Sequence, residues 1–313
     1  LVKAGYRVRV AVRRPHLAGD VRLAGAPGWV DIVQANIRNK ASVAAAVEGA
    51  DAVVNLVGIL FEKGAQNFEA AQRDGAINVA EACRDSGIDR LVHISAIGAD
   101  ESSSADYAKT KAQAEQGVRD VLPSAVILRP SIVFGPEDAF FNRFAAMAAH
   151  PIASIAPFLP AIGGGTTKLQ PVYAGDVADA IAQAVSRPDA AGKTYELGGP
   201  RTYTFNEIYD FIGKTIDRKR YALPLPFFIA KPMGLTFGTL FRYVPPLSSG
   251  IFGPPPITGD QVEMLKTDNV VADEALTLKD LGVEELETVE AIVPSYLYRF
   301  RPYGQYHQKS EPT

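Results

Sequence analysis

A tyrosine and a lysine four residues apart, in the stretch Tyr107-Ala-Lys-Thr-Lys111, are the two side chains with the clearest chemical use in this sequence. On a helix, residues at this spacing lie on one face, one turn apart. A lysine ammonium there can lower the pKa of the phenol, which is about 10 in water, and can reach a nucleotide ribose. The pair therefore indicates a proton donor beside a bound hydride carrier. The alternative is a solvated helix face.

The segments around this pair favour the chemical interpretation. Arg90–Ser95 reads as a buried strand ending in a serine, and Ala125–Pro130 reads as another buried strand. Strands alternating with helices, with strands apolar on both faces, indicate a doubly wound parallel sheet of the Rossmann type. Further strand-like runs are Tyr6–Val12, Val30–Val33 and Asp51–Val57, and helix-like runs are Ala41–Val47 and Phe68–Ser86, the latter closed by Gly87.

The start of the chain lacks two parts of such a fold. A Rossmann unit has a strand and a glycine-rich turn before its first helix. Leu1–Gly5 reads as the last turn of that helix. We therefore expect the first strand and the glycine-rich loop, roughly 20 residues together, to be missing from this sequence.

The sequence divides into two expected domains. Residues 1–160 are predicted to form an NADP-binding Rossmann-like domain, and residues 161–313 a smaller C-terminal α/β lobe. One strand of the lobe is expected to return to the Rossmann sheet, and Thr194–Gly199 reads as a strand that ends in two glycines. Asp176 is predicted to cap the helix that follows it, and Thr204–Glu207 has the pattern of a capping box.

Two arginines at the end of the Tyr6–Val12 strand, Arg13 and Arg14, indicate which nucleotide binds. An NAD-binding unit places an acidic residue there, which accepts hydrogen bonds from the ribose 2′-hydroxyl. Two guanidinium groups suit a 2′-phosphate instead. The pattern favours NADPH (NADP) as the cofactor, and the alternative is a basic loop that faces solvent.

Motifs spread along the chain resemble the extended, atypical short-chain dehydrogenase/reductases. The matching stretches are Val12–Pro15, Asn55–Gly58, His93–Ser95, Gly98–Asp100, Ser103–Tyr107, Leu128–Asp138, Gln170–Tyr173 and Asp176-Val177. Within this superfamily the chain looks closest to the accessory subunits of respiratory complex I. The resemblance covers most of the chain through about Pro200 and is looser beyond.

The resemblance implies contacts with the cofactor at successive strand ends. Asn36 and Ile37 would contact the adenine, while Pro130 and Ile132 would lie near the nicotinamide. Gly58 would let the backbone approach the ribose and pyrophosphate. The whole implied set is Arg13, Arg14, Asn36, Ile37, Leu56, Val57, Gly58, Ser95, Tyr107, Lys111, Pro130 and Ile132.

The evidence for catalysis is weaker than the evidence for cofactor binding. Active members of the superfamily have a Ser or Thr just after the fifth strand, and Ile97 occupies that position here. Isoleucine can neither donate nor accept a hydrogen bond. Tyr107 and Lys111 are then vestigial catalytic residues, and we expect no turnover. The alternative is an active NADP-dependent reductase, epimerase or dehydratase that acts on a small carbonyl or nucleotide sugar.

Composition restricts the other possibilities. A net charge of −3 gives no reason to expect nucleic acid. The single cysteine, Cys83, lies in an apolar helical pattern and reads as a core residue. The four histidines show no metal-ligand spacing, so no metal is expected. No uncharged apolar run reaches the roughly 20 residues needed to span a bilayer.

Two aromatic segments are candidates for docking. Leu223–Leu247 is dense in Phe, Leu, Gly and Pro, and it could pack on the core, dock on a partner or membrane surface, or cover a substrate pocket. Tyr296–Tyr306 alternates aromatics with arginine, a composition favoured at interfaces. The predicted partners are other subunits of a respiratory NADH dehydrogenase complex. We expect the protein on the cytoplasmic face of a bacterial inner membrane, or on the mitochondrial matrix side if the source is eukaryotic.

Overall fold

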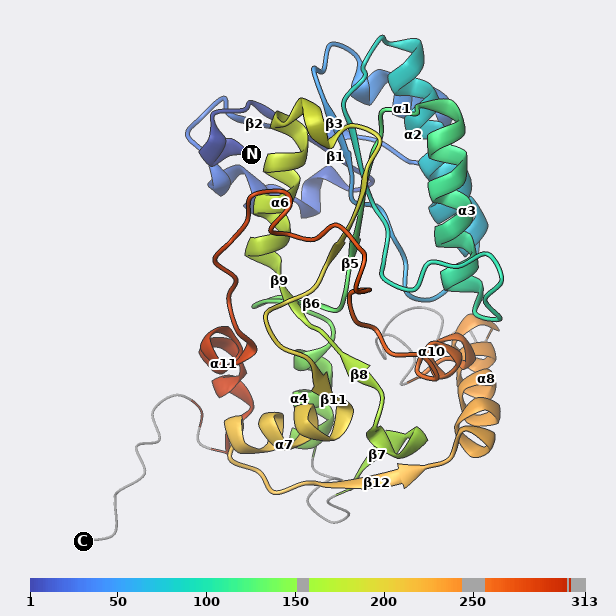
Figure 1. Ribbon diagram of the computed structural model, residues 1–313, viewed down its shortest axis with the longest axis vertical. Helices are drawn as coiled ribbons and strands as arrows, with labels where there is room; N and C mark the ends of the chain where they lie inside the picture. The colour runs from blue at the N-terminus through green and yellow to red at the C-terminus, as the bar shows by residue number, and fades with distance from the viewer. Residues whose placement is uncertain (151–157, 244–256, 303, 305–313) are drawn as a thin grey trace, which may run out of the picture.

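Parallel β-strands form the centre of the upper half of the molecule (Figure 1). The computed structural model describes residues 1–150, 158–243, 257–302 and 304. One sheet has the strand order β10-β5-β4-β3, and a separate parallel pair is formed by β1 and β2. The strands are β1 (Val8–Val12), β2 (Val30–Gln34), β3 (Val53–Asn55), β4 (Leu91–Ile94), β5 (Val126–Pro130) and β10 (Thr194–Leu197). The expected α/β class with a Rossmann-like parallel sheet is confirmed.

Helices cover both faces of these strands. Helices α1 (Lys40–Val47), α2 (Asp74–Asp85) and α3 (Asp106–Val121) share one hydrophobic cluster with the strands, and α6 (Ala174–Ser186) belongs to a second. Figure 1 places α2 and α3 on one side of the sheet and α6 on the other. A π-helical turn, η4 (Glu69–Arg73), precedes α2. Short 3₁₀ turns are η1 (Val2–Ala4), η2 (Pro15–Leu17), η3 (Gly19–Ala24), η5 (Gly163–Gly165), η6 (Pro188–Ala190) and η7 (Tyr298–Phe300).

The two sheets are connected by packing rather than by hydrogen bonds. No strand among the described residues pairs β1 with β3. Instead, Tyr6 from the segment before β1 and Val54 from β3 both pack against the cluster that α6 covers. Side-chain contacts therefore hold the β1–β2 pair against the rest of the core.

Helix α2 ends at a glycine, as the sequence predicts. Gly87 has φ +68°, in the left-handed region that a side chain disfavours. The chain reverses there, and the Ile88 N–H donates to the Cys83 carbonyl at 2.8 Å. Cys83 itself is fully buried, as expected for a core residue.

The expected cap of α6 is wrong. The helix begins at Ala174, with Tyr173 at the N-cap position, and Asp176 lies within the first turn. The Asp176 carboxylate accepts a hydrogen bond from the Glu287 N–H at 3.0 Å. A contact with a distant segment, rather than with its own helix, thus determines where this side chain points.

The lower half of the molecule surrounds an aromatic core. Phe134, Phe141 and Phe205 are buried there, and neighbouring rings meet edge to face. Thr204 and Glu207 form the predicted capping box at the start of α7. The helices are α4 (Phe141–Ala149), α7 (Phe205–Thr215), α8 (Phe227–Tyr243), α10 (Gly259–Met264), α11 (Val289–Ile292) and α12 (Pro294–Leu297). The strands are β6 (Val133–Phe134), β7 (Phe158–Ile162), β8 (Lys168–Leu169), β9 (Val172–Tyr173), β11 (Tyr203–Thr204) and β12 (Tyr221–Leu225).

The start of the expected docking tail is part of this core, which corrects the prediction for Tyr296–Tyr306. Tyr296 and Leu297 are buried in the aromatic cluster. The Tyr296 hydroxyl donates to Asp138 Oδ2 at 2.5 Å, and the Arg301 guanidinium donates to the Thr215 carbonyl. Tyr296 and Phe300 thus pack in the same cluster as residues of this chain's own α4 and α7. Tyr303 and residues 305–313 lie outside the described residues.

Replacing Tyr296 by alanine should therefore lower the free energy of unfolding by about 3–5 kcal/mol, because a buried ring is removed and a cavity remains. Tyr298→Ala, at a half-buried position two residues on, is the matched control and should cost about 1 kcal/mol. Urea denaturation followed by fluorescence measures both values. Equal, small losses would mean that this segment does not belong to the core.

Candidate functional site

The tyrosine–lysine pair lies at the carboxyl edge of the parallel strands. Tyr107 is in the first turn of α3, and Lys111 is one turn later. The carboxylate of Asp260, from α10, accepts hydrogen bonds from the N–H groups of Asp106 (2.7 Å) and Tyr107 (2.9 Å). A carboxylate at a helix N-terminus satisfies free N–H groups and complements the helix dipole. A residue of the second lobe therefore fixes the start of the helix that carries the pair.

Lys111 is a buried cation. Its side chain is 4% exposed, and Nζ donates to the Ile94 carbonyl at 3.0 Å. Burial lowers the pKa of Lys111 from 10.5 to about 8, and the nearby Glu115 carboxylate opposes this shift. A side chain added at Gly58, in the loop after β3, would lie 3.4 Å from Nζ. The ammonium is therefore enclosed between the ends of β3 and β4 and helix α3.

The phenol of Tyr107 is not the activated acid that the sequence predicts. Burial raises its pKa to about 12, with a further contribution from the Asp260 carboxylate. Its ring packs edge to face against Phe68, with 6.0 Å between the ring centroids. The expected lowering of the pKa by Lys111 is wrong for this structure, because loss of solvent around the phenol dominates.

Ile97, predicted to replace a catalytic hydroxyl, lies buried in the loop after β4. It is 6% exposed, its N–H donates to the Pro130 carbonyl, and its carbonyl accepts from Asn269 Nδ2 at 3.2 Å. Asn269 also accepts through Oδ1 from the Ser131 hydroxyl at 2.6 Å. The segment around Asn269 thus runs across the strand ends and fixes the loop after β4. No local pattern predicts that Asn269 holds the loop around Ile97, because the two residues lie 172 positions apart.

The other residues expected to contact a nucleotide also lie at strand ends. Arg13 and Arg14 follow β1 and are exposed. Asn36 and Ile37 follow β2, and the Ile37 carbonyl accepts from the Asn78 amide of α2 at 3.0 Å.

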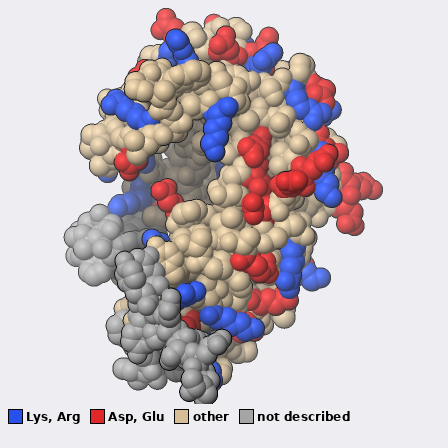
Figure 2. Space-filling view, turned by 90° about the vertical axis from the view of Figure 1, so that its left-hand side faces the viewer, with Lys and Arg blue, Asp and Glu red and all other residues tan. Residues whose placement is uncertain are grey.

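Leu56 and Val57, after β3, are exposed apolar residues beside Gly58. The face seen in Figure 2 is hollowed between its upper and lower halves, with Lys and Arg at parts of the rim. The exposed side chains of Leu56 and Val57, and the closeness of the Gly58 backbone to the Lys111 ammonium, fit a dinucleotide that lies along the carboxyl ends of the strands.

Buried polar atoms at the end of β4 point to the same edge. Asn55 Oδ1 accepts from the Val57 N–H, so its Nδ2 faces His93 Nδ1 at 3.1 Å. This arrangement assigns the imidazole proton to Nε2, and burial keeps the ring neutral by lowering its pKa to about 3. His93 Nε2 and Ser95 Oγ are buried without a hydrogen-bond partner in the described part of the chain. Such groups are costly unless something satisfies them, and Ser95 fits a hydrogen bond to a bound nucleotide.

A set of ion pairs that the sequence analysis missed extends from Lys111. Glu115, one turn further along α3, is buried and receives two hydrogen bonds from the Arg129 guanidinium, at 2.9 and 2.7 Å. Arg129 also contacts Glu196 of β10 at 3.5 Å, and Glu196 accepts from the Ala272 N–H at 2.9 Å. These charged side chains thus form a series from the surroundings of the Lys111 ammonium to the segment around Ala272, which crosses the carboxyl ends of the strands.

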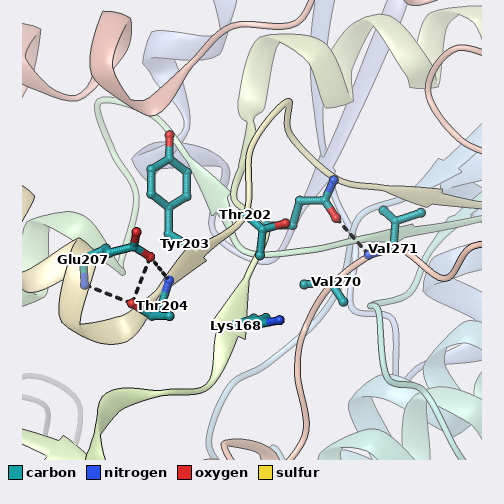
Figure 3. A pocket seen from close by; sticks show the side chains of 8 residues that line it. Lys168, Thr202, Tyr203, Thr204, Glu207, Val270 and Val271 are labelled. Atoms are coloured by element: carbon teal, nitrogen blue, oxygen red, sulfur yellow. Dashed lines mark hydrogen bonds between the residues drawn. The ribbon is translucent and has the colours of Figure 1, made fainter.

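A pocket of about 390 Å³ lies outside this group of residues (Figure 3). Three of its polar side chains already have partners: Thr204 and Glu207 bond each other, and Gln170 bonds the Gly199 carbonyl and the Val271 N–H. The pocket includes neither Tyr107 nor Lys111. We therefore take the strand ends, and not this pocket, as the candidate site. The lining residues are Lys168, Gln170, Thr202, Tyr203, Thr204, Glu207, Val270 and Val271.

Sequence comparison agrees with the fold. The chain belongs to the NAD dependent epimerase/dehydratase family, whose model matches residues 1–198. Its resemblance to respiratory complex I subunits is also confirmed. It is 36% identical to "NADH dehydrogenase [ubiquinone] 1 alpha subcomplex subunit 9, mitochondrial" of Arabidopsis thaliana, over 90% of this chain and 69% of that protein.

Two further comparisons extend this result. The chain is 30% identical to the mitochondrial NADH-ubiquinone oxidoreductase 40 kDa subunit of Neurospora crassa, over 98% of this chain and 76% of that protein. Among solved structures, an NADPH-dependent quinone oxidoreductase from Escherichia coli, complexed with NADPH, matches with a TM-score of 0.67. That match has 18% identity and covers 93% of this chain and 90% of the other. At this identity it supports the fold.

Among the described residues, no group of three or more His, Cys, Asp or Glu could hold a metal ion. In the same part of the chain, no helix is both long enough and apolar enough to cross a membrane.

Nucleotide affinity should depend on pH through Lys111. The buried ammonium loses its proton as the pH rises through about 8, so NADPH should bind roughly tenfold more weakly at pH 9.5 than at pH 7. Lys111→Arg keeps its charge throughout and should remove this dependence. Calorimetric titration with NADPH at pH 7 and pH 9.5 measures these affinities in the parent protein and in Lys111→Arg. The same pH profile in the parent and in Lys111→Arg would contradict the assignment.

Proposed function

We propose that this protein is an NADP(H)-binding accessory subunit that stabilises or assembles a respiratory NADH dehydrogenase complex, complex I, without turnover. The observation that carries the proposal is the similarity to complex I subunits along about nine-tenths of the chain. A bound nucleotide stabilises the folded state by linkage whether or not it reacts. Its expected place is the cytoplasmic face of a bacterial inner membrane, or the matrix side of a mitochondrial one.

The strand ends support binding without catalysis. Lys111, Gly58 and Ser95 offer a cation, a close backbone and an unsatisfied hydroxyl to a nucleotide. A reducing cofactor would supply a hydride, and a carbonyl substrate would then need a proton donor and a second hydroxyl. Ile97 has no hydroxyl, Asn269 holds its backbone, and the raised pKa of Tyr107 makes its phenol a weaker acid and so a poorer proton donor.

An active NADP-dependent reductase, epimerase or dehydratase is the second candidate. The observation that favours it is the retained pair itself, Tyr107 and Lys111, on one helix beside the unsatisfied Ser95 hydroxyl. Such an enzyme would act on a small carbonyl or a nucleotide sugar, with the hydroxyl of Ser95 in place of the one that Ile97 lacks.

Migration in detergent-solubilised native membranes tests the proposed role most directly. The protein should run with a large NADH-oxidising complex, and deleting its gene should reduce the amount of that complex. Migration alone, as a small free protein, would overturn the proposal.

The nucleotide preference should follow the two arginines. The protein should bind NADPH more tightly than NADH by about 1.5–3 kcal/mol, the contribution of a charge-assisted phosphate contact. Arg13→Ala/Arg14→Ala should remove most of that difference in calorimetric titrations. Arg84→Ala, at an exposed position on α2 where Arg84 pairs with Asp85, is the control and should leave this difference unchanged. Equal affinities in the parent chain would contradict the prediction.

Turnover should be absent. NADPH oxidation with ketones, quinones or nucleotide sugars should stay at the background rate, and Tyr107→Phe should leave the amount of assembled complex nearly unchanged. Lys111→Ala should weaken nucleotide binding in the same preparations. Steady-state oxidation that disappears in Tyr107→Phe would instead favour the reductase.

A further inference from the structure

We propose that β12 and α8 form a surface that binds an anionic phospholipid membrane in the plane of its headgroups. The inference rests on the proposed function and specifies one contact of that subunit. In Figure 1, β12 runs along the lower edge of the molecule between α7 and α8. The three elements are consecutive in the chain, Phe205–Thr215, Tyr221–Leu225 and Phe227–Tyr243.

Helix α8 turns an apolar face to the solvent. Ala230 and Gly234 are buried on its inner side, where a side chain at Gly234 would come within 2.7 Å of the backbone at Thr258. Phe228 (77% exposed) and Leu235, seven residues later, lie on one outward face. Ile229, Met233 and Leu240 are also exposed. An exposed helix face in water normally carries charged residues, so this face is suited to an apolar environment.

The strand before the helix adds exposed aromatic and aliphatic area. Tyr221 and Leu223 of β12 are each more than half exposed. Phe158, on the neighbouring strand β7, is also exposed, and its ring centroid lies 6.2 Å from that of Tyr221. Tyrosine and phenylalanine are favoured where an apolar layer meets water.

Positive charge is concentrated next to this apolar area. The segment 214–220, which leads into β12, contains four basic residues and one acidic residue, in a chain whose net charge is −3. Lys214 and Lys219 are exposed there. Arg218 and Arg220 donate to the carbonyls of Phe300 and Ala148, which anchors them without neutralising their charge. The basic segment lies at the start of β12 and α8 follows its other end (Figure 1), so positive charge and exposed apolar side chains share one edge, a combination that binds anionic lipid surfaces.

The distribution of acidic residues agrees with one preferred orientation. Seven Asp and Glu but one Lys lie in residues 273–290, and Figure 2 shows Asp and Glu gathered along one side of the molecule. An anionic surface would repel that side and attract the edge with Lys214 and Lys219. Because α8 does not qualify as a membrane-spanning helix, the contact lies in the headgroup plane. A protein partner would more often match such a basic edge with carboxylates of its own, and this is the alternative outcome of the test.

Sedimentation with lipid vesicles tests the proposal on the full chain. The protein should bind vesicles of phosphatidylcholine with phosphatidylglycerol and not vesicles of phosphatidylcholine alone, and salt should weaken the binding. Lys214→Gln/Lys219→Gln should weaken it about 25-fold, since each basic residue near an anionic surface contributes roughly fivefold. Phe228→Gln/Leu235→Gln should weaken it about tenfold or more.

A matched control separates surface charge from total charge. Lys193→Gln/Lys279→Gln removes two exposed lysines from the Rossmann-like half and should leave vesicle binding within about twofold of the parent. Because all the replaced side chains are exposed, each variant should remain folded, which circular dichroism checks.

Two outcomes would overturn the inference. One is no binding to anionic vesicles, or equal binding to neutral ones. The other is that the parent chain binds no vesicles, while the Phe228→Gln/Leu235→Gln variant no longer co-migrates with the respiratory complex. This edge would then be a protein interface. NADPH affinity and co-migration of the parent chain test the proposed function separately, so either idea can fail alone.

Discussion

The buried ammonium of Lys111 is the charge on which the rest of this structure depends. A cation removed from water needs a compensating partner, and the only acceptor within hydrogen-bond distance among the described contacts is a backbone carbonyl at the end of β4. Glu115 supplies the nearby negative charge, but Glu115 is itself buried and needs Arg129. Arg129 in turn contacts Glu196, whose other oxygen holds the Ala272 backbone. The two fully buried charges, on Lys111 and Glu115, are thus compensated by residues from other elements of the fold.

That sequence of contacts explains why the two halves of the molecule meet at the strand ends. Glu196 and Ala272 bring the C-terminal segment to the sheet, and Asn269 then bonds both Ser131 and the Ile97 carbonyl. Asp260 holds the start of α3 from the other lobe. The loop that contains Ile97 is thus a packing element.

The lower lobe separates its aromatic residues into two groups with different environments. Phe141, Phe205 and Tyr296 pack against one another and exclude water, and they fix α4, α7 and the start of the tail. Tyr221 is exposed beside a basic segment, and Phe228 is exposed beyond the other end of β12. The first group makes the lobe rigid, and the second leaves one edge with a composition that water alone does not favour.

The sequence by itself determined the local features and the family. Alternating apolar strands and helices, the glycine after α2 and the Thr204 capping box follow from residues a few positions apart, so their patterns are legible without a fold. The tertiary structure decided what depends on distant residues. Asn269 meets Ile97 across 172 positions, Asp176 turns to Glu287 rather than to its own helix, and Tyr296 enters the core. The direction of the Tyr107 pKa shift belongs to this second group. Spacing places Lys111 beside the phenol, but only packing determines how much water surrounds it, and loss of that water is the larger effect.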